Sequence, residues 1–124
     1  MNKGLYFADM DKMKKLAASP RFRSRFFSPQ EMKFLMSKNF SPYTIGEMFC
    51  GKVAFKKAIG ASFRDCKMCE VSVLADYSGS YYLSFSGSSK KLITDMGKQV
   101  YISCAHNKSM VMSSVTIVER QFHY

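Results

Sequence analysis

Residues 41–60 have the sequence SPYTIGEMFCGKVAFKKAIG and predict one helix. Pro42 follows Ser41 and suits the first helical turn, where its missing N–H leaves no hydrogen bond unmade. Gly60 is placed to end the helix, because glycine adopts the left-handed conformation of many helix C-termini. Apolar residues recur at helical spacing on one face, at Ile45, Met48, Phe49 and Val53.

The residues before this helix predict a strand and two further helices. Gly4 to Ala8 is a short apolar strand with Asp9 at its end. Apolar side chains at helical spacing follow, and Pro20 stops that helix. A third helix begins at Ser28, where Glu31 completes a capping box. The apolar positions of the first helix are Met10, Met13 and Leu16.

From about Cys69 the apolar residues alternate, as they do in strands. The turn Ser78-Gly79 predicts a hairpin, and Gly97 ends a short helix over 88–96. The predicted strands cover 71–75, 81–85, 100–104 and 111–117. Helices first and strands later predict an α+β fold, with N-terminal helices packed on a mostly antiparallel sheet. A chain of 124 residues has room for one such domain, over 1–124.

Composition limits the compartment and the partners. The formal net charge of +10 favours acidic partners. No apolar run is long enough to cross a bilayer, and no secretion signal precedes the strand, so we expect a cytoplasmic protein without membrane contact. Cysteines are then reduced thiols, and Cys66-x-x-Cys69 has no second pair at zinc-ligand spacing.

Several short strings in this order resemble the holo-acyl-carrier-protein synthase family of phosphopantetheinyl transferases. Residues 49–60 follow the family pattern Phe-x-x-Lys-Glu-Ala-x-x-Lys-Ala-x-Gly, except at Val53. Residues 21–31 follow its Arg-Phe-x-x-Arg, apolar pair, Ser/Thr-x-x-Glu segment. A Gly-x-x-Tyr hairpin at 79–82 and Ser-x-x-His at 103–106 complete the set. The resemblance implies transfer of 4'-phosphopantetheine from coenzyme A to a carrier-protein serine, by a homotrimer.

The resemblance also implies the site residues. Lys52 and His106 stand at catalytic positions, and Lys52, Lys57 and His106 are expected to hold the phosphates of coenzyme A. Asp9 is expected to be the metal ligand. A register three residues earlier instead places Tyr6 at that position and leaves no ligand. We prefer Asp9, because it keeps the strand intact and the Lys-Lys-Leu-Ala string aligned.

Val53 is the departure that matters most, since the family has a metal-ligand Glu there. Valine cannot coordinate Mg²⁺, which requires hard oxygen ligands in octahedral array. We therefore expect weak or absent Mg²⁺ binding and a weakened transferase activity, because cationic stabilisation of phosphoryl oxygens is a large part of such catalysis. The alternative is a non-catalytic module that binds coenzyme A or acyl carrier protein.

A basic segment between 12 and 25 is the expected docking site for acyl carrier protein. In the resembling family this segment contacts the acidic carrier. The contact residues expected here are Lys12, Lys15, Arg21 and Arg25. A nucleic-acid-binding domain is the third hypothesis, carried by charge and by the alternation of Arg and Phe. Retention of Lys52, Lys57 and His106 favours the first two hypotheses, since nucleic-acid binding needs no such set.

Overall fold

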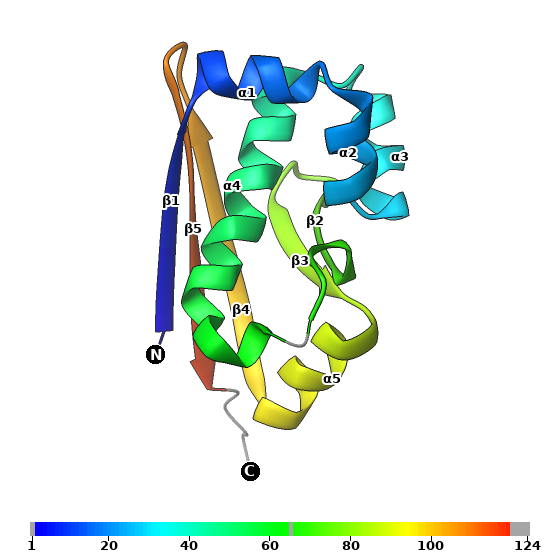
Figure 1. Cartoon of the computed structure of the whole chain (residues 1–124). Coiled ribbons are helices and arrows are strands. Elements are labelled where there is room, and N and C mark those ends of the chain that lie inside the picture. The colour runs from blue at the N-terminus through cyan, green and yellow to red at the C-terminus, as the bar shows by residue number, and fades with distance from the viewer. Residues whose placement is uncertain (1, 65, 120–124) are drawn as a thin grey trace.

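The computed structural model describes residues 2–64 and 66–119. Three antiparallel strands form its larger sheet, in the order β1-β5-β4. β5 is the central strand and pairs with a neighbour on each side (Figure 1). The strands are β1 (Asn2–Asp9), β4 (Lys98–His106) and β5 (Met110–Glu119). β1 and β4 are therefore the two edges of this sheet.

The long helix α4 (Pro42–Ile59) covers one face of the sheet. Gly4 allows β1 to pass close to it, because a Cβ there would collide with the carbonyl oxygen of Ala54. Alternation then turns Tyr6 and Ala8 to the same face as Gly4. Fully buried residues of α4 form the core beneath it, among them Ile45, Met48, Ala54 and Phe55.

Three short helices cover the end of the molecule that lies at the top of Figure 1. They are α1 (Met10–Ala17), α2 (Pro20–Phe26) and α3 (Pro29–Ser37). A side-chain oxygen caps each N-terminus, from Asp9, Ser19 and Ser28 respectively. The capping box of Ser28 and Glu31 is confirmed.

A hairpin and a last helix complete the fold beside α4. β2 (Val71–Ala75) pairs with β3 (Tyr81–Phe85) as a separate two-stranded sheet. α5 (Gly87–Met96) follows, and Gly97 ends it in the left-handed conformation. Two 3-10 turns, η1 (Gly60–Phe63) and η2 (Met68–Glu70), connect α4 to the hairpin.

The α+β fold with antiparallel pairing is confirmed, and two details differ from the prediction. The strands form two sheets instead of one. The Arg-Phe segment is a helix, α2, which begins at the Pro20 that was expected only to stop its predecessor. Phe22 and Phe26 lie four residues apart, and their rings stack with 5.4 Å between centroids. This spacing places both side chains on one face of a helix. Within the described residues no helix is both long and apolar enough for a membrane span.

Candidate functional site

Tyr6 lies beside the face of α4 that carries Val53. The Tyr6 and Phe49 rings pack edge to face, with 6.0 Å between their centroids, and the Lys57 ammonium lies 5.4 Å from the centroid of the Tyr6 ring. Phe49, Val53 and Lys57 are spaced by four residues and share one face of the helix. A ring that contacts the first and the last of them lies over the middle one. The structure thus favours the register that places Tyr6 across from Val53.

Asp9 occupies a different place from Tyr6. It ends β1, is exposed, and accepts a hydrogen bond of 2.8 Å from the backbone N–H of Asp11 as the cap of α1. This is a structural role that Asp fills at many helix N-termini. Asp9 lies three residues along the strand from Tyr6, about 10 Å, and so is not beside Val53.

The donor set beside Val53 does not fit a divalent metal. Tyr6, Phe49 and Val53 offer one phenol oxygen and no carboxylate, and Lys57 adds a positive charge. Across residues 2–64 and 66–119, no three His, Cys, Asp or Glu side chains gather in a group that could hold a metal ion. The residues beside Val53 therefore do not supply a carboxylate ligand for the Mg²⁺ that the resemblance implies.

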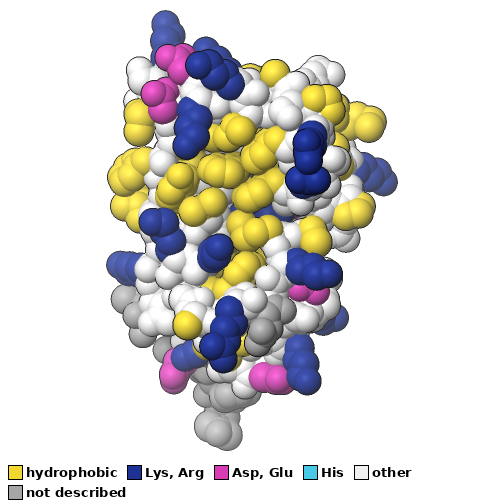
Figure 2. Space-filling model, in the orientation of Figure 1, with side chains coloured by type: hydrophobic (Ala, Val, Ile, Leu, Met, Phe, Trp, Pro, Cys, Tyr) yellow, Lys and Arg dark blue, Asp and Glu magenta, His cyan; other side chains and the backbone are white. Residues whose placement is uncertain are grey.

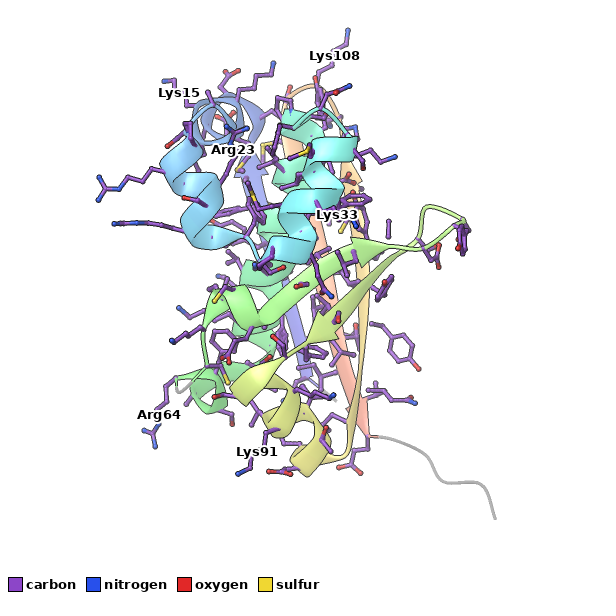
Figure 3. All side chains as sticks on the ribbon, turned by 90° about the vertical axis from the view of Figure 1, so that its right-hand side faces the viewer. Lys15, Arg23, Lys33, Arg64, Lys91 and Lys108 are labelled. Carbon is purple, nitrogen blue, oxygen red and sulfur yellow. The ribbon has the colours of Figure 1, made fainter. Side chains whose placement is uncertain are left out.

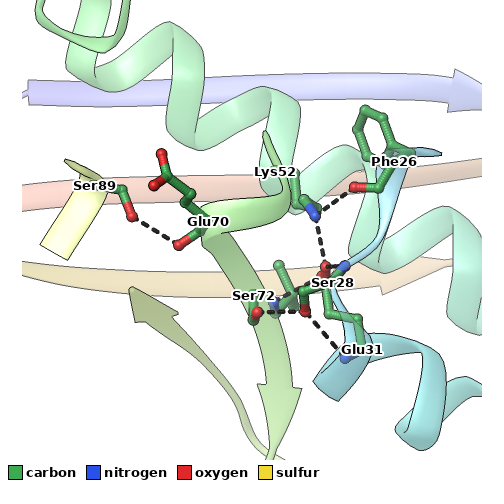
Figure 4. Close-up of polar contacts among 8 residues, drawn as sticks. Phe26, Ser28, Glu31, Lys52, Glu70, Ser72 and Ser89 are labelled. Atoms are coloured by element: carbon green, nitrogen blue, oxygen red, sulfur yellow. Dashed lines mark hydrogen bonds and ion pairs between the residues drawn. The ribbon is translucent and has the colours of Figure 1, made fainter. Parts of the chain in front are cut away.

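Lys52, expected to contact phosphate, lies inside the protein. Its ammonium is 2.5 Å from Oε1 of Glu31 and donates to the carbonyl oxygen of Phe26 at 2.7 Å (Figure 4). Neither charged side chain is exposed to solvent. The other carboxylate oxygen of Glu31 accepts from the N–H of Val73 at 2.9 Å. This position corrects the expectation from sequence: the ammonium is buried, donates to two acceptors of its own chain, and does not face a ligand.

Burial shifts the pKa of both members of this pair toward their neutral forms. It raises the pKa of Glu31 and lowers that of Lys52, while their mutual attraction opposes both shifts. The pair links α2, α3, α4 and β2, since its partners come from each of these elements. Its geometry fixes the basic helix α2 against the rest of the protein.

His106 lies at the end of β4 and is the exposed member of a second cluster. Its Nδ1 is 3.5 Å from Oε2 of Glu47, and its ring packs on Tyr43 at 4.8 Å between centroids. The Tyr81 hydroxyl donates to Glu47 Oε1 at 3.2 Å. Burial and the Glu47 carboxylate raise the pKa of Tyr81, so this phenol stays protonated as a donor. The Glu47 carboxylate thus lies between the imidazole and the Tyr81 hydroxyl.

Two thiols near this cluster are not nucleophiles at neutral pH. Burial raises the pKa of Cys50 to about 12 and that of Cys104 to about 11. Since only the thiolate attacks, both side chains are poor nucleophiles, and their sulfurs hydrogen-bond within the protein. The reactive groups of this cluster are therefore the His106 imidazole and the Glu47 carboxylate.

Lys57 and His106 are too far apart in one chain to hold the same phosphate group. His106 contacts Glu47, and Lys57 comes ten residues later on α4, about 15 Å further along the axis. Lys57 lies on the β1 side of the helix, and His106 ends β4 at the opposite edge. A site that uses both residues needs a second copy of the chain.

The face of the larger sheet that α4 leaves uncovered carries apolar side chains. Leu5 is 45% exposed and Phe7 is 51% exposed. Phe7 aligns with Met112 of the central strand, and Met112 aligns with Ala105 of β4. A pocket of about 320 Å³ lies along this row, and His106 belongs to its rim.

The basic segment is exposed at the end of the molecule built by α1, α2 and α3. Lys15, Arg23 and Lys33 lie there, and Arg64 and Lys91 lie at the opposite end (Figure 3). Arg23 packs its guanidinium 4.3 Å from the Phe40 ring and is partly buried. The exposed cations are Lys12, Lys14, Lys15, Arg21 and Arg25. In the described part of the chain, none of them forms an ion pair within 4.0 Å.

An apolar surface adjoins these cations. Hydrophobic side chains gather over the upper half of the face that α4 presents, bordered by Lys and Arg (Figure 2). Phe22 and Phe26 line a pocket of about 340 Å³ together with Arg21 and Arg25. The segment therefore offers charge and apolar area side by side.

Sequence reasoning missed two site residues, Glu31 and Glu47. The sequence predicts Glu31 only as part of a capping box, and its second partner, Lys52, is 21 residues away. Glu47 stands in no pattern that the sequence displays. Both contacts depend on how α4 lies against other elements, which spacing along the chain does not show.

Comparisons with known proteins identify relatives of the whole chain. No protein-family model matches the chain. The chain is 31% identical over 98 residues to a curated holo-acyl-carrier-protein synthase of Alkaliphilus oremlandii, covering 78% of this chain and 80% of the relative. It is 27% identical over 107 residues to one of Clostridium botulinum, covering 86% and 87%.

Solved structures share the fold. The Chronobacterium ammoniagenes ACPS–CoA complex superposes with a TM-score of 0.81 at 19% identity, covering 97% of this chain and 98% of that chain. Helicobacter pylori holo-acyl-carrier-protein synthase in complex with coenzyme A gives a TM-score of 0.75 at 18% identity, covering 94% and 99%. At these identities the structural likeness concerns the fold.

Proposed function

Because the chain belongs to the holo-acyl-carrier-protein synthase family, we propose that it binds coenzyme A and transfers 4'-phosphopantetheine to a serine of acyl carrier protein. The serine oxygen bonds to the phosphorus that carries pantetheine. The bridging P–O bond breaks, and 3',5'-ADP leaves with the bond's electron pair. The serine proton passes to a base, a role open to His106 held by Glu47 at 3.5 Å.

One observation carries this proposal. Lys57 and His106 are both exposed and lie toward opposite edges of a sheet whose outer face is apolar. In the proposed contact, unlike edges of two copies meet, and the ammonium of one copy lies near the imidazole of the other. The ammonium then holds the pyrophosphate by charge-assisted hydrogen bonds, worth about 1.5–3 kcal/mol each, and the imidazole of the other copy stays available as the base.

We extend the proposal to a homotrimer. The strand edges β1 and β4 belong to every copy, so a head-to-tail contact between unlike edges repeats from copy to copy, and a rotation of about 120° at each contact closes it into a ring of three. Burying Leu5, Phe7 and Met110 in that contact removes exposed apolar area from water. The active site is then complete only in the assembly.

The exposed cations of α1 and α2 are the proposed docking site for acyl carrier protein. Lys12, Lys15, Arg21 and Arg25 face solvent and meet no acid of their own chain within the described residues. An acidic partner offsets their mutual repulsion. The buried Lys52–Glu31 pair holds α2 in place and so supports docking without touching the carrier.

We propose that a divalent metal ion binds this protein weakly or not at all. The ligand role expected of Asp9 stays a prediction, and its carboxylate caps α1 away from Val53. A lowered turnover is expected, since no carboxylate-bound metal neutralises the phosphoryl oxygens. If turnover is absent, the same contacts support a non-catalytic module that binds coenzyme A and the carrier.

The experiment is to incubate the protein with coenzyme A and apo acyl carrier protein, and to follow the carrier's mass. Gain of a phosphopantetheine group supports the transferase. An unchanged mass with intact binding of both partners supports the non-catalytic module. Absence of binding to coenzyme A and to the carrier overturns both functions.

A further inference from the structure

The family implies a divalent metal beside Val53, and the residues present there do not fit one. Tyr6 of β1 lies over this point of α4. The centroid of its ring is 6.0 Å from that of Phe49. Mg²⁺ is bound in proteins through carboxylates, phosphates and water in strict octahedral geometry. An aromatic ring and a valine supply none of these ligands except a single phenol oxygen.

A different cation is already in place. The Lys57 ammonium lies 5.4 Å from the centroid of the Tyr6 ring, within the range of a cation–π contact. Lys57 is exposed, and no ion pair within the described residues engages it. An ammonium has three donors, of which the ring face uses none as a conventional hydrogen bond. Its charge and its N–H groups remain available to an anion.

The fold holds the two residues together. Gly4 lets β1 approach α4 so closely that a Cβ at that position would lie 2.8 Å from the backbone nitrogen of Ala58. Tyr6 comes two residues later on the same face of the strand, so its ring is fixed against the helix. The ammonium of Lys57 is therefore seated by the backbone path of β1.

We propose that the Lys57 ammonium, seated on the Tyr6 ring, replaces a divalent metal in binding the pyrophosphate of the ligand. Binding is then independent of metal. The inference rests on the proposed function for the identity of the ligand as coenzyme A. The positive charge that offsets the pyrophosphate then comes from the protein chain itself.

Calorimetry of the full chain with coenzyme A, in excess EDTA and then in MgCl₂, tests this directly. The affinity should be the same in both buffers. Lys57→Met should weaken it about tenfold or more, the loss of one hydrogen bond to a charged group. Lys56→Met is the matched control, because Lys56 is an exposed neighbour on the same helix and should leave affinity unchanged. A tenfold gain on adding Mg²⁺, or equal effects of the two substitutions, overturns the proposal.

Direct metal binding gives a second readout. Wild type titrated with Mn²⁺ alone should show no bound metal by electron paramagnetic resonance. The double variant Tyr6→Asp, Val53→Glu places two carboxylates across from each other and should bind Mn²⁺. Stoichiometric Mn²⁺ on wild type overturns the proposal whether or not the double variant folds.

Inorganic pyrophosphate separates this inference from the proposed function. Binding of pyrophosphate in EDTA, lost in Lys57→Met, supports the lysine site even if coenzyme A does not bind. In that case the proposed function is wrong and the inference holds. If neither pyrophosphate nor coenzyme A binds wild type, the inference fails as well.

Discussion

The Lys52 ammonium and the Glu31 carboxylate form an ion pair of 2.5 Å with no solvent exposure on either side. Breaking such a pair by removing one partner leaves an uncompensated buried charge, which costs about 3–5 kcal/mol. We expect Lys52→Met to lower the free energy of unfolding by this amount in urea. The double variant Lys52→Met, Glu31→Met should lose less than the sum of the two single changes. Additive losses would contradict the pairing.

The pH dependence of Lys52→Met follows from the same pair. Burial raises the pKa of Glu31 above 4.5, and the charge of Lys52 opposes this rise. Without Lys52 the folded-state pKa rises further. A carboxyl with a higher pKa in the folded state takes up a proton on folding, so stability increases as pH falls toward the unfolded value.

The measurement is the free energy of unfolding of Lys52→Met relative to wild type, at pH 7 and at pH 5. We expect the deficit of the variant to shrink at pH 5. A deficit that grows on acidification would show that Glu31 is not the group left unpaired.

The sequence predicted elements well and their contacts less well. Ser28, Glu31 and Gly97 predicted helix ends through local rules, and the structure has them. Lys52 shows the limit: a lysine in a family motif was assigned to a ligand, but α4 turns it toward Glu31 and the Phe26 carbonyl. Which face of a long helix is buried depends on partners far away in the chain.

The two registers at the first strand show the same limit. String matching preferred Asp9, since Lys14 and Lys15 aligned well in that register. The close approach of Gly4 to α4 and the ring contacts of Tyr6 are three-dimensional facts that no string contains. They favour Tyr6 as the residue across from Val53.

Phe7→Glu tests the proposed assembly. Phe7 is 51% exposed on the uncovered face of the sheet, and a carboxylate buried there by a partner copy would be unpaired. We expect wild type to sediment as a trimer and Phe7→Glu as a monomer with an unchanged circular dichroism spectrum. Tyr77→Glu is the control, because Tyr77 is fully exposed in the β2–β3 turn and should keep the trimer. A monomeric wild type at micromolar concentration contradicts both the assembly and the shared active site.

Charge reversal on α2 tests the carrier-protein partner. Arg21 and Arg25 are exposed, and together they line the pocket that Phe22 and Phe26 complete. Charges at the rim of an interface act mainly on the encounter of the partners. Arg21→Glu, Arg25→Glu should therefore lower the association rate for an acidic carrier protein more than it raises the dissociation rate.

The control reverses two exposed lysines on α5, Lys90 and Lys91, at the end of the molecule where Figure 3 places Lys91. The net charge changes by the same amount in both double variants, so a general effect of charge slows association equally. A local docking site slows it only in the α2 variant. Stopped-flow rates at two salt concentrations separate the cases, since exposed charges are screened beyond about 8 Å at physiological ionic strength.

A nucleic-acid-binding domain would instead bind a mixed oligonucleotide tightly, with a steep salt dependence. Tight oligonucleotide binding without binding to any carrier protein would overturn the docking proposal.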